Sequence, residues 1–301
     1  MSQRIVINNT YLEVRYEGGD GPLVVILTGM GCSFEEWHDI IETLLPTNRI
    51  LTFHRQGLGQ SDIGEGVCST ESAVRDLNEL LSYFKIEEPF YLVGHSYGGL
   101  CAQHFAKVFP ERLAGVILVD STSVDLKELD ALDTPVLNEE SDEAWIGKCL
   151  DYAQKDKEEL REIMKPALSE QHLQFPTYVQ ERLIDFQITS TLYKAMASEI
   201  QQWKNDAEVI KELGGFPDVP LMVIGRDSEF TINAELNSGI PLEELRRFEE
   251  KWRELISIQG SLSPKSEVIF AGNSGHSVYL DRPDLIVECI HRMISCGKPS
   301  K

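Results

Sequence analysis

The chain has 301 residues and a net charge of −21, from 28 Lys and Arg against 49 Asp and Glu. This length suits one large α/β domain or a domain with a sizeable insertion, and 42% hydrophobic residues is an ordinary globular composition. The acidity argues against binding the phosphates of nucleic acid, and no apolar run approaches the roughly 20 residues of a membrane helix.

The N-terminal residues and the cysteines bear on location. The chain begins with a strand pattern and lacks the apolar core of a secretory signal there. Its six cysteines are scattered, with neither a C-x-x-C pair nor the spacing of a zinc site. We therefore expect a cytoplasmic protein with reduced thiols, no bound metal and no membrane contact, present as a monomer or homodimer.

Short apolar runs alternate with helical patterns along the chain. Residues 4–16 alternate in polarity around the turn-forming pair Asn8-Asn9, which predicts an N-terminal hairpin. Helical patterns, as at 69–84 and 100–108, separate continuous apolar runs that are typical of parallel strands buried on both faces. These runs lie at 23–27, 50–53, 90–93, 116–119, 221–224 and 268–270. The alternation predicts a mostly parallel, doubly wound α/β sheet.

The alternation breaks between residues 120 and 219, where the sequence has no convincing strand pattern. Helical segments near 139–164, 176–190 and 191–213 predict a helical cap inserted after the sixth strand. We place this cap at 123–217, between a first part of the core at 1–122 and a second part at 218–301.

The first half of the predicted cap is strongly acidic. Residues 125–162 contain 13 Asp or Glu and 5 Lys or Arg, a net of −8. A solvated helix face explains this charge. If the charged faces of these helices lie toward the site entrance, the charge also influences which molecules approach the site. A second, shorter insertion follows Asp227 and includes a strong helix near 243–258.

The pattern G-x-S-x-G occurs between a predicted strand and a predicted helix. Gly94-His95-Ser96-Tyr97-Gly98 follows the apolar run at 90–93 and precedes a helical pattern. A serine nucleophile in a tight strand-to-helix turn needs small residues two positions away on each side. The sequence therefore predicts that Ser96 is the nucleophile; the alternative is a glycine-rich turn with an inert serine.

A serine nucleophile needs a histidine base and a carboxylate that orients it. His276 is the best candidate for the base, because it lies in a loop between the last apolar run and the final helix. For the carboxylate we favour Asp227, which follows the run at 221–224. Asp120, at the end of the run at 116–119, remains the rival; its other role would be to cap the loop that enters the cap.

Two backbone amides can stabilise the oxyanion. Gly29-Met30-Gly31 follows the first long apolar run, where small residues let the backbone approach a substrate carbonyl. We assign the donors to the N–H groups of Met30 and Tyr97. Phe34, Trp145 and Trp203 are candidates for the substrate pocket, although for the cap aromatics packing of the cap on the core is the favoured interpretation.

Taken together, these motifs resemble the α/β-hydrolase superfamily, specifically its cap-bearing single-domain members. The likeness covers nearly all of the core. Segments 54–62, 109–113, 116–120, 219–225 and 274–283 resemble the family's D-x-x-G-x-G-x-S loop, the turn after the nucleophile helix, the following strand, the late strand and the histidine loop.

The sequence departs from this family's pattern in two places. His54 stands where the family usually has Asp, and we expect it to alter loop hydrogen bonding; alternatively it places an imidazole near the site mouth. Gly225-Arg226-Asp227 is one residue shorter than usual between the glycine and the acid.

A serine at the elbow, as the resemblance implies, points to acyl transfer without a metal or organic cofactor. We expect hydrolysis of a small, fairly apolar carboxylic ester, with a small-molecule substrate as the partner. C–C cleavage or hydroxynitrile-lyase-like activity on the same triad is a second hypothesis, which a charged residue in the pocket would favour. A ligand sensor without enzymatic activity is a third.

Overall fold

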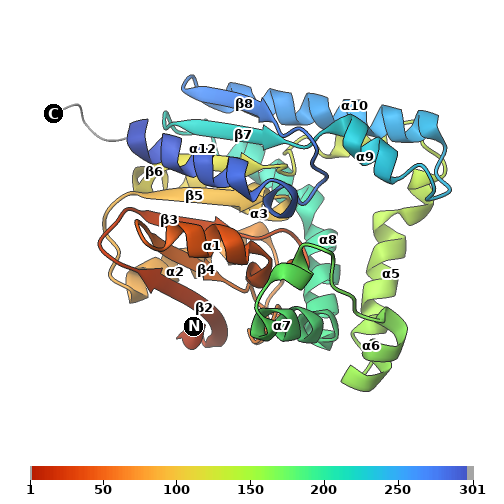
Figure 1. Ribbon diagram of the computed structural model, residues 1–301, viewed down its shortest axis with the longest axis horizontal. Helices are drawn as coiled ribbons and strands as arrows, with labels where there is room; N and C mark the ends of the chain where they lie inside the picture. The colour runs from red at the N-terminus through yellow and green to blue at the C-terminus, as the bar shows by residue number, and fades with distance from the viewer. Residues whose placement is uncertain (1, 297–301) are drawn as a thin grey trace.

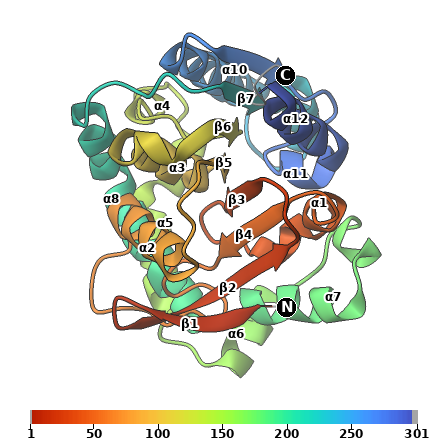
Figure 2. The same cartoon turned by 90° about the vertical axis from the view of Figure 1, so that its left-hand side faces the viewer.

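The computed structural model describes residues 2–296, which form one eight-stranded sheet with helices on both faces (Figures 1 and 2). The strand order is β1-β2-β4-β3-β5-β6-β7-β8. β1–β2 and β2–β4 pair antiparallel, and the other neighbours pair parallel. The strands are β1 (Gln3–Ile7), β2 (Thr10–Gly18), β3 (Leu23–Leu27), β4 (Arg49–Phe53), β5 (Phe90–His95), β6 (Leu113–Val119), β7 (Leu221–Gly225) and β8 (Ser266–Phe270).

The predicted N-terminal hairpin is formed by β1 and β2. Asn8 and Asn9 both have positive φ, 51° and 64°, as the tight turn between two such strands requires. Asparagine tolerates this conformation better than most residues, so the local sequence explains the turn.

The sheet is covered on both faces, which explains its continuous apolar strands. On one face α2 (Thr70–Tyr83) and α3 (Tyr97–Val108) pack in a core cluster that includes Leu77 and Phe105. On the other face α1 (His38–Leu44) and α12 (Pro283–Cys296) pack in a second cluster that includes Ile41 and Ile290. Figure 2 shows the two groups of helices on opposite sides of the sheet. The predicted doubly wound α/β fold is confirmed.

The chain between β6 and β7 is helical, and we refer to residues 123–217 as the insertion. Its helices are α4 (Lys127–Asp130), η3 (Leu137–Glu140), α5 (Asp142–Tyr152), α6 (Lys157–Met164), η4 (His172–Gln174), α7 (Thr177–Gln187) and α8 (Ser190–Glu212). The long α8 packs against α2 and α3, and α5 packs along α8 (Figure 1). The insertion is thus anchored on two of the helices that cover one face of the sheet.

A second helical segment separates β7 from β8. It contains α9 (Ser228–Ala234), α10 (Leu242–Gln259) and η5 (Gly260–Leu262), and α10 packs against β7. The remaining short helices are η1 (Phe34–Trp37), η2 (Pro110–Arg112) and α11 (Val278–Asp281). Across residues 2–296, none of the helices has both the length and the apolar character needed to cross a bilayer.

Candidate active site

Ser96 stands at the turn between β5 and α3. Its backbone has φ 52° and ψ −122°, a conformation that a non-glycine residue adopts only under strain. A Cβ on Gly94 would lie 2.5 Å from the carbonyl oxygen of Gly98, and one on Gly98 would lie 2.5 Å from the carbonyl oxygen of Thr28. Both glycines are therefore required by close backbone approach, as the motif predicts.

His276 reaches Ser96 from the loop between β8 and α11. Its Nε2 lies 3.0 Å from Ser96 Oγ. The backbone of this loop is held from two sides: the Gly275 N–H donates to Asp281, and His95 Nε2 lies 3.0 Å from the His276 carbonyl oxygen. Burial, together with the neighbouring His276, lowers the pKa of His95 to about 3, so His95 is neutral and donates to that carbonyl.

The carboxylate that contacts His276 belongs to Asp120, at the end of β6. Asp120 Oδ2 lies 2.6 Å from His276 Nδ1, and the Asp120 side chain is fully buried. An ionised carboxylate only accepts hydrogen bonds, so Nδ1 carries the proton and Nε2 is left free to accept from the Ser96 hydroxyl. The arrangement sets the imidazole tautomer that a general base needs.

This finding corrects the expectation that Asp227 is the acid. Asp227 begins α9, and its carboxylate accepts from the backbone N–H groups of Glu229, Phe230 and Asn273. The side chain therefore caps the helix and points away from His276. Arg226, the residue before Asp227, instead contacts Asp120 and has its Nη1 3.4 Å from His276 Nδ1.

Arg226 places its positively charged guanidinium against the Asp120 carboxylate. Its Nη1 lies 3.0 Å from Asp120 Oδ2, and its own backbone N–H donates to Oδ1 at 3.1 Å. On α10, Trp252 Nε1–H donates to Oδ1 at 2.9 Å, and Glu249 pairs with the rest of the guanidinium. Burial would raise the pKa of the Asp120 carboxyl, but Arg226 and the His276 hydrogen bond hold it well below its usual range.

The two predicted oxyanion donors lie on either side of the elbow. Tyr97 is the first residue of α3, where a helical N–H has no partner within the helix. Met30 lies in the loop after β3, and the side chain of Arg55 holds the backbone of this loop in place. Arg55 donates to the carbonyl oxygens of Thr28 and Gly29 at 2.7 and 3.1 Å, and forms a buried ion pair with Glu199 of α8. The Arg55 guanidinium thus links α8 of the insertion to the loop that contains Met30.

Of the three predicted pocket residues, two line one cavity and the third is buried. Trp145 of α5 and Trp203 of α8 line a cavity of about 540 Å³ whose wall also includes Trp252. Phe34 is 1% exposed and stacks on the His54 ring, with centroids 3.9 Å apart, which corrects its assignment to the pocket. The Phe34 ring packs inside the protein against His54 instead.

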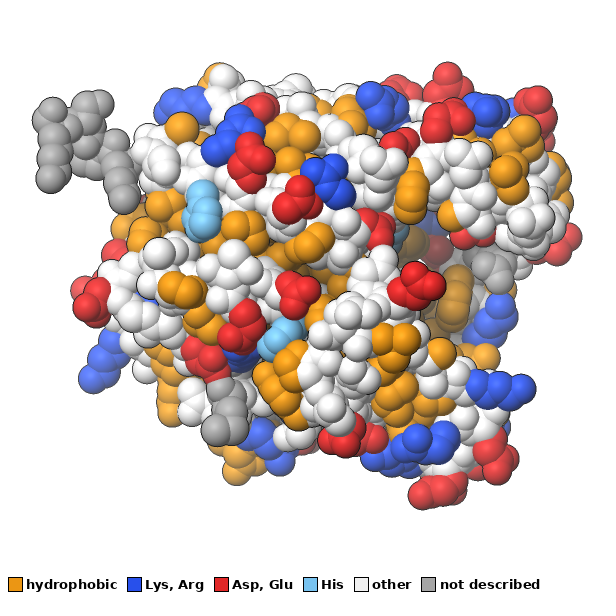
Figure 3. Space-filling model, viewed as in Figure 1, with side chains coloured by type: hydrophobic (Ala, Val, Ile, Leu, Met, Phe, Trp, Pro, Cys, Tyr) orange, Lys and Arg blue, Asp and Glu red, His pale blue; other side chains and the backbone are white. Residues whose placement is uncertain are grey.

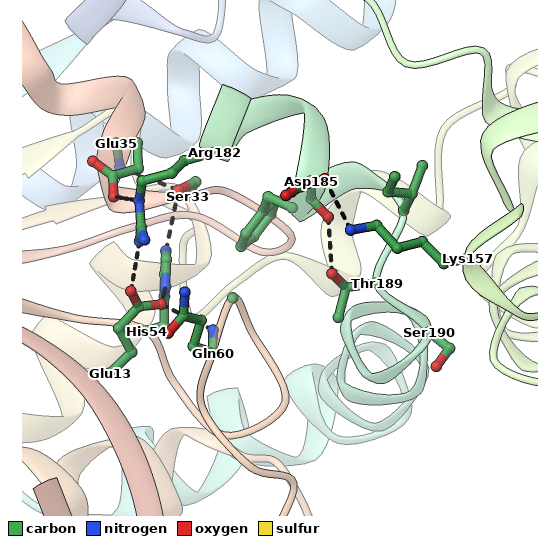
Figure 4. Close-up of a pocket in the computed structure, with 13 residues that line it drawn as sticks. Glu13, Ser33, Glu35, His54, Gln60, Lys157, Arg182, Asp185, Thr189 and Ser190 are labelled. Carbon is green, nitrogen blue, oxygen red and sulfur yellow. Dashed lines mark hydrogen bonds and ion pairs between the residues drawn. The ribbon is translucent and has the colours of Figure 1, made fainter. Parts of the chain in front are cut away.

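His54 serves loop structure, in agreement with the first of the two expectations. Its Nδ1 lies 2.8 Å from Glu13, and its Nε2 accepts the backbone N–H of Phe34 at 3.2 Å. Glu13 and Glu35 both pair with Arg182 of α7, so this buried cluster ties the insertion to the core (Figure 4). The adjoining cavity of about 420 Å³ is lined by these polar residues and by none of Ser96, His276 or Asp120.

The family is decided by the sequence match. The pattern of the alpha/beta hydrolase fold family covers residues 22–283. The chain belongs to the α/β-hydrolase family. The uncharacterized protein YqjL of Bacillus subtilis is 24% identical to this α/β-hydrolase over 270 residues, 90% of this chain and 82% of that protein. The predicted family is confirmed, and a hydrolase of this family is supported at that coarse level.

Solved structures share the fold. An esterase from Thermogutta terrifontis, with malate bound, has a TM-score of 0.65 and 20% identity to this α/β-hydrolase, covering 99% of this chain and 100% of that one. The enol-lactonase from Burkholderia xenovorans has a TM-score of 0.66 and 18% identity, covering 97% and 100%. At these identities the likeness concerns the fold and leaves the substrate open.

Three side chains of this α/β-hydrolase site were not predicted from the sequence: Arg226, Glu249 and Trp252. One signal was available, because Arg226 directly follows the β7 strand at the edge where the site lies. Glu249 and Trp252 come from α10, whose helical pattern was visible but whose facing was not. Within the described residues, no three His, Cys, Asp or Glu side chains gather so as to hold a metal ion.

Proposed function

We propose that this α/β-hydrolase is a serine hydrolase that cleaves small, uncharged carboxylic esters through an acyl-enzyme intermediate. The observation that supports it is the chain of contacts from Ser96 Oγ to His276 Nε2 at 3.0 Å and from His276 Nδ1 to Asp120 Oδ2 at 2.6 Å. A nucleophile, a base and an orienting carboxylate in this order are what acyl transfer requires. The helices of the insertion would act as a cap over the substrate.

In the proposed reaction, Ser96 Oγ attacks the ester carbonyl carbon while His276 Nε2 takes the hydroxyl proton. The oxyanion accepts from the N–H groups of Met30 and Tyr97. The tetrahedral intermediate then breaks its bond to the alcohol oxygen, which receives the proton from Nε2. Water attacks the Ser96 ester by the same steps and releases the acid. Throughout, Asp120 keeps its negative charge beside the imidazolium.

C–C cleavage or hydroxynitrile-lyase-like activity is the second candidate, because the charged Lys204 lines the cavity beside Trp252. Ester hydrolysis is preferred, since the Lys204 Nζ lies 2.7 Å from Asp130 and 2.9 Å from Asp142. These ion pairs leave the ammonium compensated and unsuited to bind a cyanide or enolate leaving group.

A panel of alkyl esters with acyl chains of increasing length tests the proposal. We expect turnover of short uncharged esters by the purified protein, with kcat/KM falling once the acyl chain outgrows the cavity. Mandelonitrile and a 1,3-diketone are run beside the esters. Cleavage of either of these, with no ester turned over, would assign the second candidate instead. Inertness toward every substrate would favour a ligand sensor.

Arg226 offers a test of how the acid is held. We expect Arg226→Met to lower kcat/KM by about ten- to hundredfold, because Asp120 loses the charge that anchors it. Arg226 also lowers the pKa of the Asp120 carboxyl, so its loss should raise the pKa of a carboxyl that must stay ionised to orient His276. The acid side of the pH profile of kcat/KM should therefore move to higher pH.

The control for this prediction separates catalysis from folding. Arg226→Met leaves Glu249 buried without its partner, which costs about 3–5 kcal/mol of stability. The double variant Arg226→Met with Glu249→Gln removes that orphaned charge and should regain much of the stability. The shift in the pH profile should persist in it. An unshifted profile in the stable double variant would show that Arg226 serves the fold alone.

A further inference from the structure

A cavity of about 540 Å³ adjoins the proposed triad through one side chain, Trp252. The indole N–H of Trp252 donates to Asp120 Oδ1 at 2.9 Å, and its ring meets the His276 ring edge-on, with centroids 5.8 Å apart. A wall of the cavity therefore touches both the acid and the base. Ser96, His276 and Asp120 are not among the residues that line the cavity, so Trp252 is its link to the proposed triad.

The lining of this cavity is rich in flat apolar surface. Three of the chain's four tryptophans line it, together with Phe248, whose ring lies nearly parallel to that of Trp252. Leu126 and Leu129 of the insertion add aliphatic surface. Figure 3 shows hydrophobic side chains in the hollow of this face between α9 and α5. Such a lining fits an apolar substituent of the substrate.

The charged groups of the cavity are mostly carboxylates. Asp130, Asp142 and Glu143 line it against the single ammonium of Lys204. Lys204 is already compensated, because its Nζ lies within 2.9 Å of both Asp130 and Asp142. The four groups carry a formal net charge of −2. Behind Trp252, the Asp120–Arg226–Glu249 cluster adds two carboxylates and one guanidinium, which makes the region more negative.

We propose that this cavity binds the non-reacting substituent of the ester, accepts an uncharged or cationic group there, and rejects a carboxylate. The inference rests on the proposed esterase function and adds its charge selectivity. A carboxylate entering the cavity would meet uncompensated negative charge at low dielectric, whereas no free cation is available among the lining residues to pair with it. A quaternary ammonium meets aromatic faces and carboxylates, which attract it.

Esters that differ only in one terminal group test this proposal. The acyl chain is CH2–CH2–C(=O) and ends in tert-butyl, in trimethylammonium, which has the same shape and a positive charge, or in carboxylate, which is smaller and negative. A second series carries the same three ends on the alcohol side. In the series whose varied end enters the cavity, we expect kcat/KM for the carboxylate to be about tenfold or more below that for tert-butyl. Protein with Ser96→Ala supplies the blank.

Variants of the cavity charges then assign the selectivity to this place. The double variant Asp130→Asn with Asp142→Asn brings the formal charge of the four groups to zero, and should raise the carboxylate-to-tert-butyl ratio about tenfold. Lys204→Met makes the cavity more negative, so it should lower that ratio. Asp284→Asn with Glu288→Gln, on α12 and outside the cavity, changes the net charge by the same amount and should leave the ratio unaltered.

The possible outcomes distinguish a failure of the charge selectivity from a failure of the proposed esterase function. Equal turnover of the three esters in both series, or an equal response to the α12 control, would overturn the charge selectivity and leave the esterase proposal standing. Loss of turnover for every ester, tert-butyl included, would count against the esterase function itself. A carboxylate ester that is hydrolysed best would also overturn the inference, and would indicate a cation that the lining conceals.

Discussion

Replacing Asp120 by asparagine should lower kcat for ester hydrolysis by about four orders of magnitude, whereas Asp227→Asn should change it by less than about twofold. Asp120 faces four donors, which are His276 Nδ1–H, Arg226 Nη1–H, Trp252 Nε1–H and the Arg226 backbone N–H. An asparagine offers one acceptor oxygen to this set, and its NH2 group must face donors.

The consequence for the base follows from hydrogen-bond chemistry. If the asparagine NH2 group faces His276, then Nδ1 must accept, and the ring proton moves to Nε2. An imidazole with its proton on Nε2 cannot take the proton of Ser96. The rate falls because the wrong tautomer is favoured, even where the geometry of the site is intact. Thermal unfolding of the variant, followed by circular dichroism, measures any accompanying loss of stability.

Asp227→Asn is the matched control, because the same chemical change falls on the neighbouring acid. Asparagine caps a helix about as well as aspartate, so α9 keeps its N-terminal hydrogen bonds. Both variants are compared with wild type in kcat and in melting temperature. A collapse of kcat in Asp227→Asn, with Asp120→Asn still active, would return the acid role to Asp227.

Ser96→Ala should abolish labelling by a fluorophosphonate probe and lower ester turnover by roughly four to six orders of magnitude. The probe forms a covalent bond with an activated serine oxygen, which requires a base in contact with it. Alanine changes one atom at a backbone position that already has positive φ, so the elbow should fold as before. Intact mass spectrometry after labelling reports the stoichiometry.

The specificity of this labelling is checked with a distant serine. Ser261 lies exposed in η5, where its hydroxyl donates to the carbonyl oxygen of Ile258. Ser261→Ala should label to the same extent as wild type. Labelling that persists in Ser96→Ala would show that another serine is the nucleophile, and the proposed mechanism would fail with it.

The local patterns of the chain predicted the elbow well, for a physical reason. The backbone turn at Ser96 depends on residues within a few positions of it, because Gly94 and Gly98 are excluded from bearing a Cβ by nearby backbone. The position of His276 follows similarly from the end of β8 and the start of the next helix. Information of this kind is local, and a single sequence contains it.

The triad acid could not be predicted from local sequence, because its identity depends on packing between distant segments. Both Asp120 and Asp227 follow parallel strands at the same edge of the sheet, so strand position could not choose between them. Arg226 and Trp252 hold Asp120 beneath His276, and Trp252 comes from α10, some 130 residues further along the chain. The placement of Phe34 failed for the same reason, since its partner His54 lies on another loop.

The sequence by itself determined the fold family, the elbow with its serine, and the loop that brings a histidine to it. The sequence also showed how acidic residues 125–162 are, but it did not show which way these acidic side chains point. The tertiary structure alone decided which carboxylate contacts His276 and which acidic side chains of the insertion line the cavity. Both depend on how α8 and α10 pack, and packing joins residues that no sequence spacing connects.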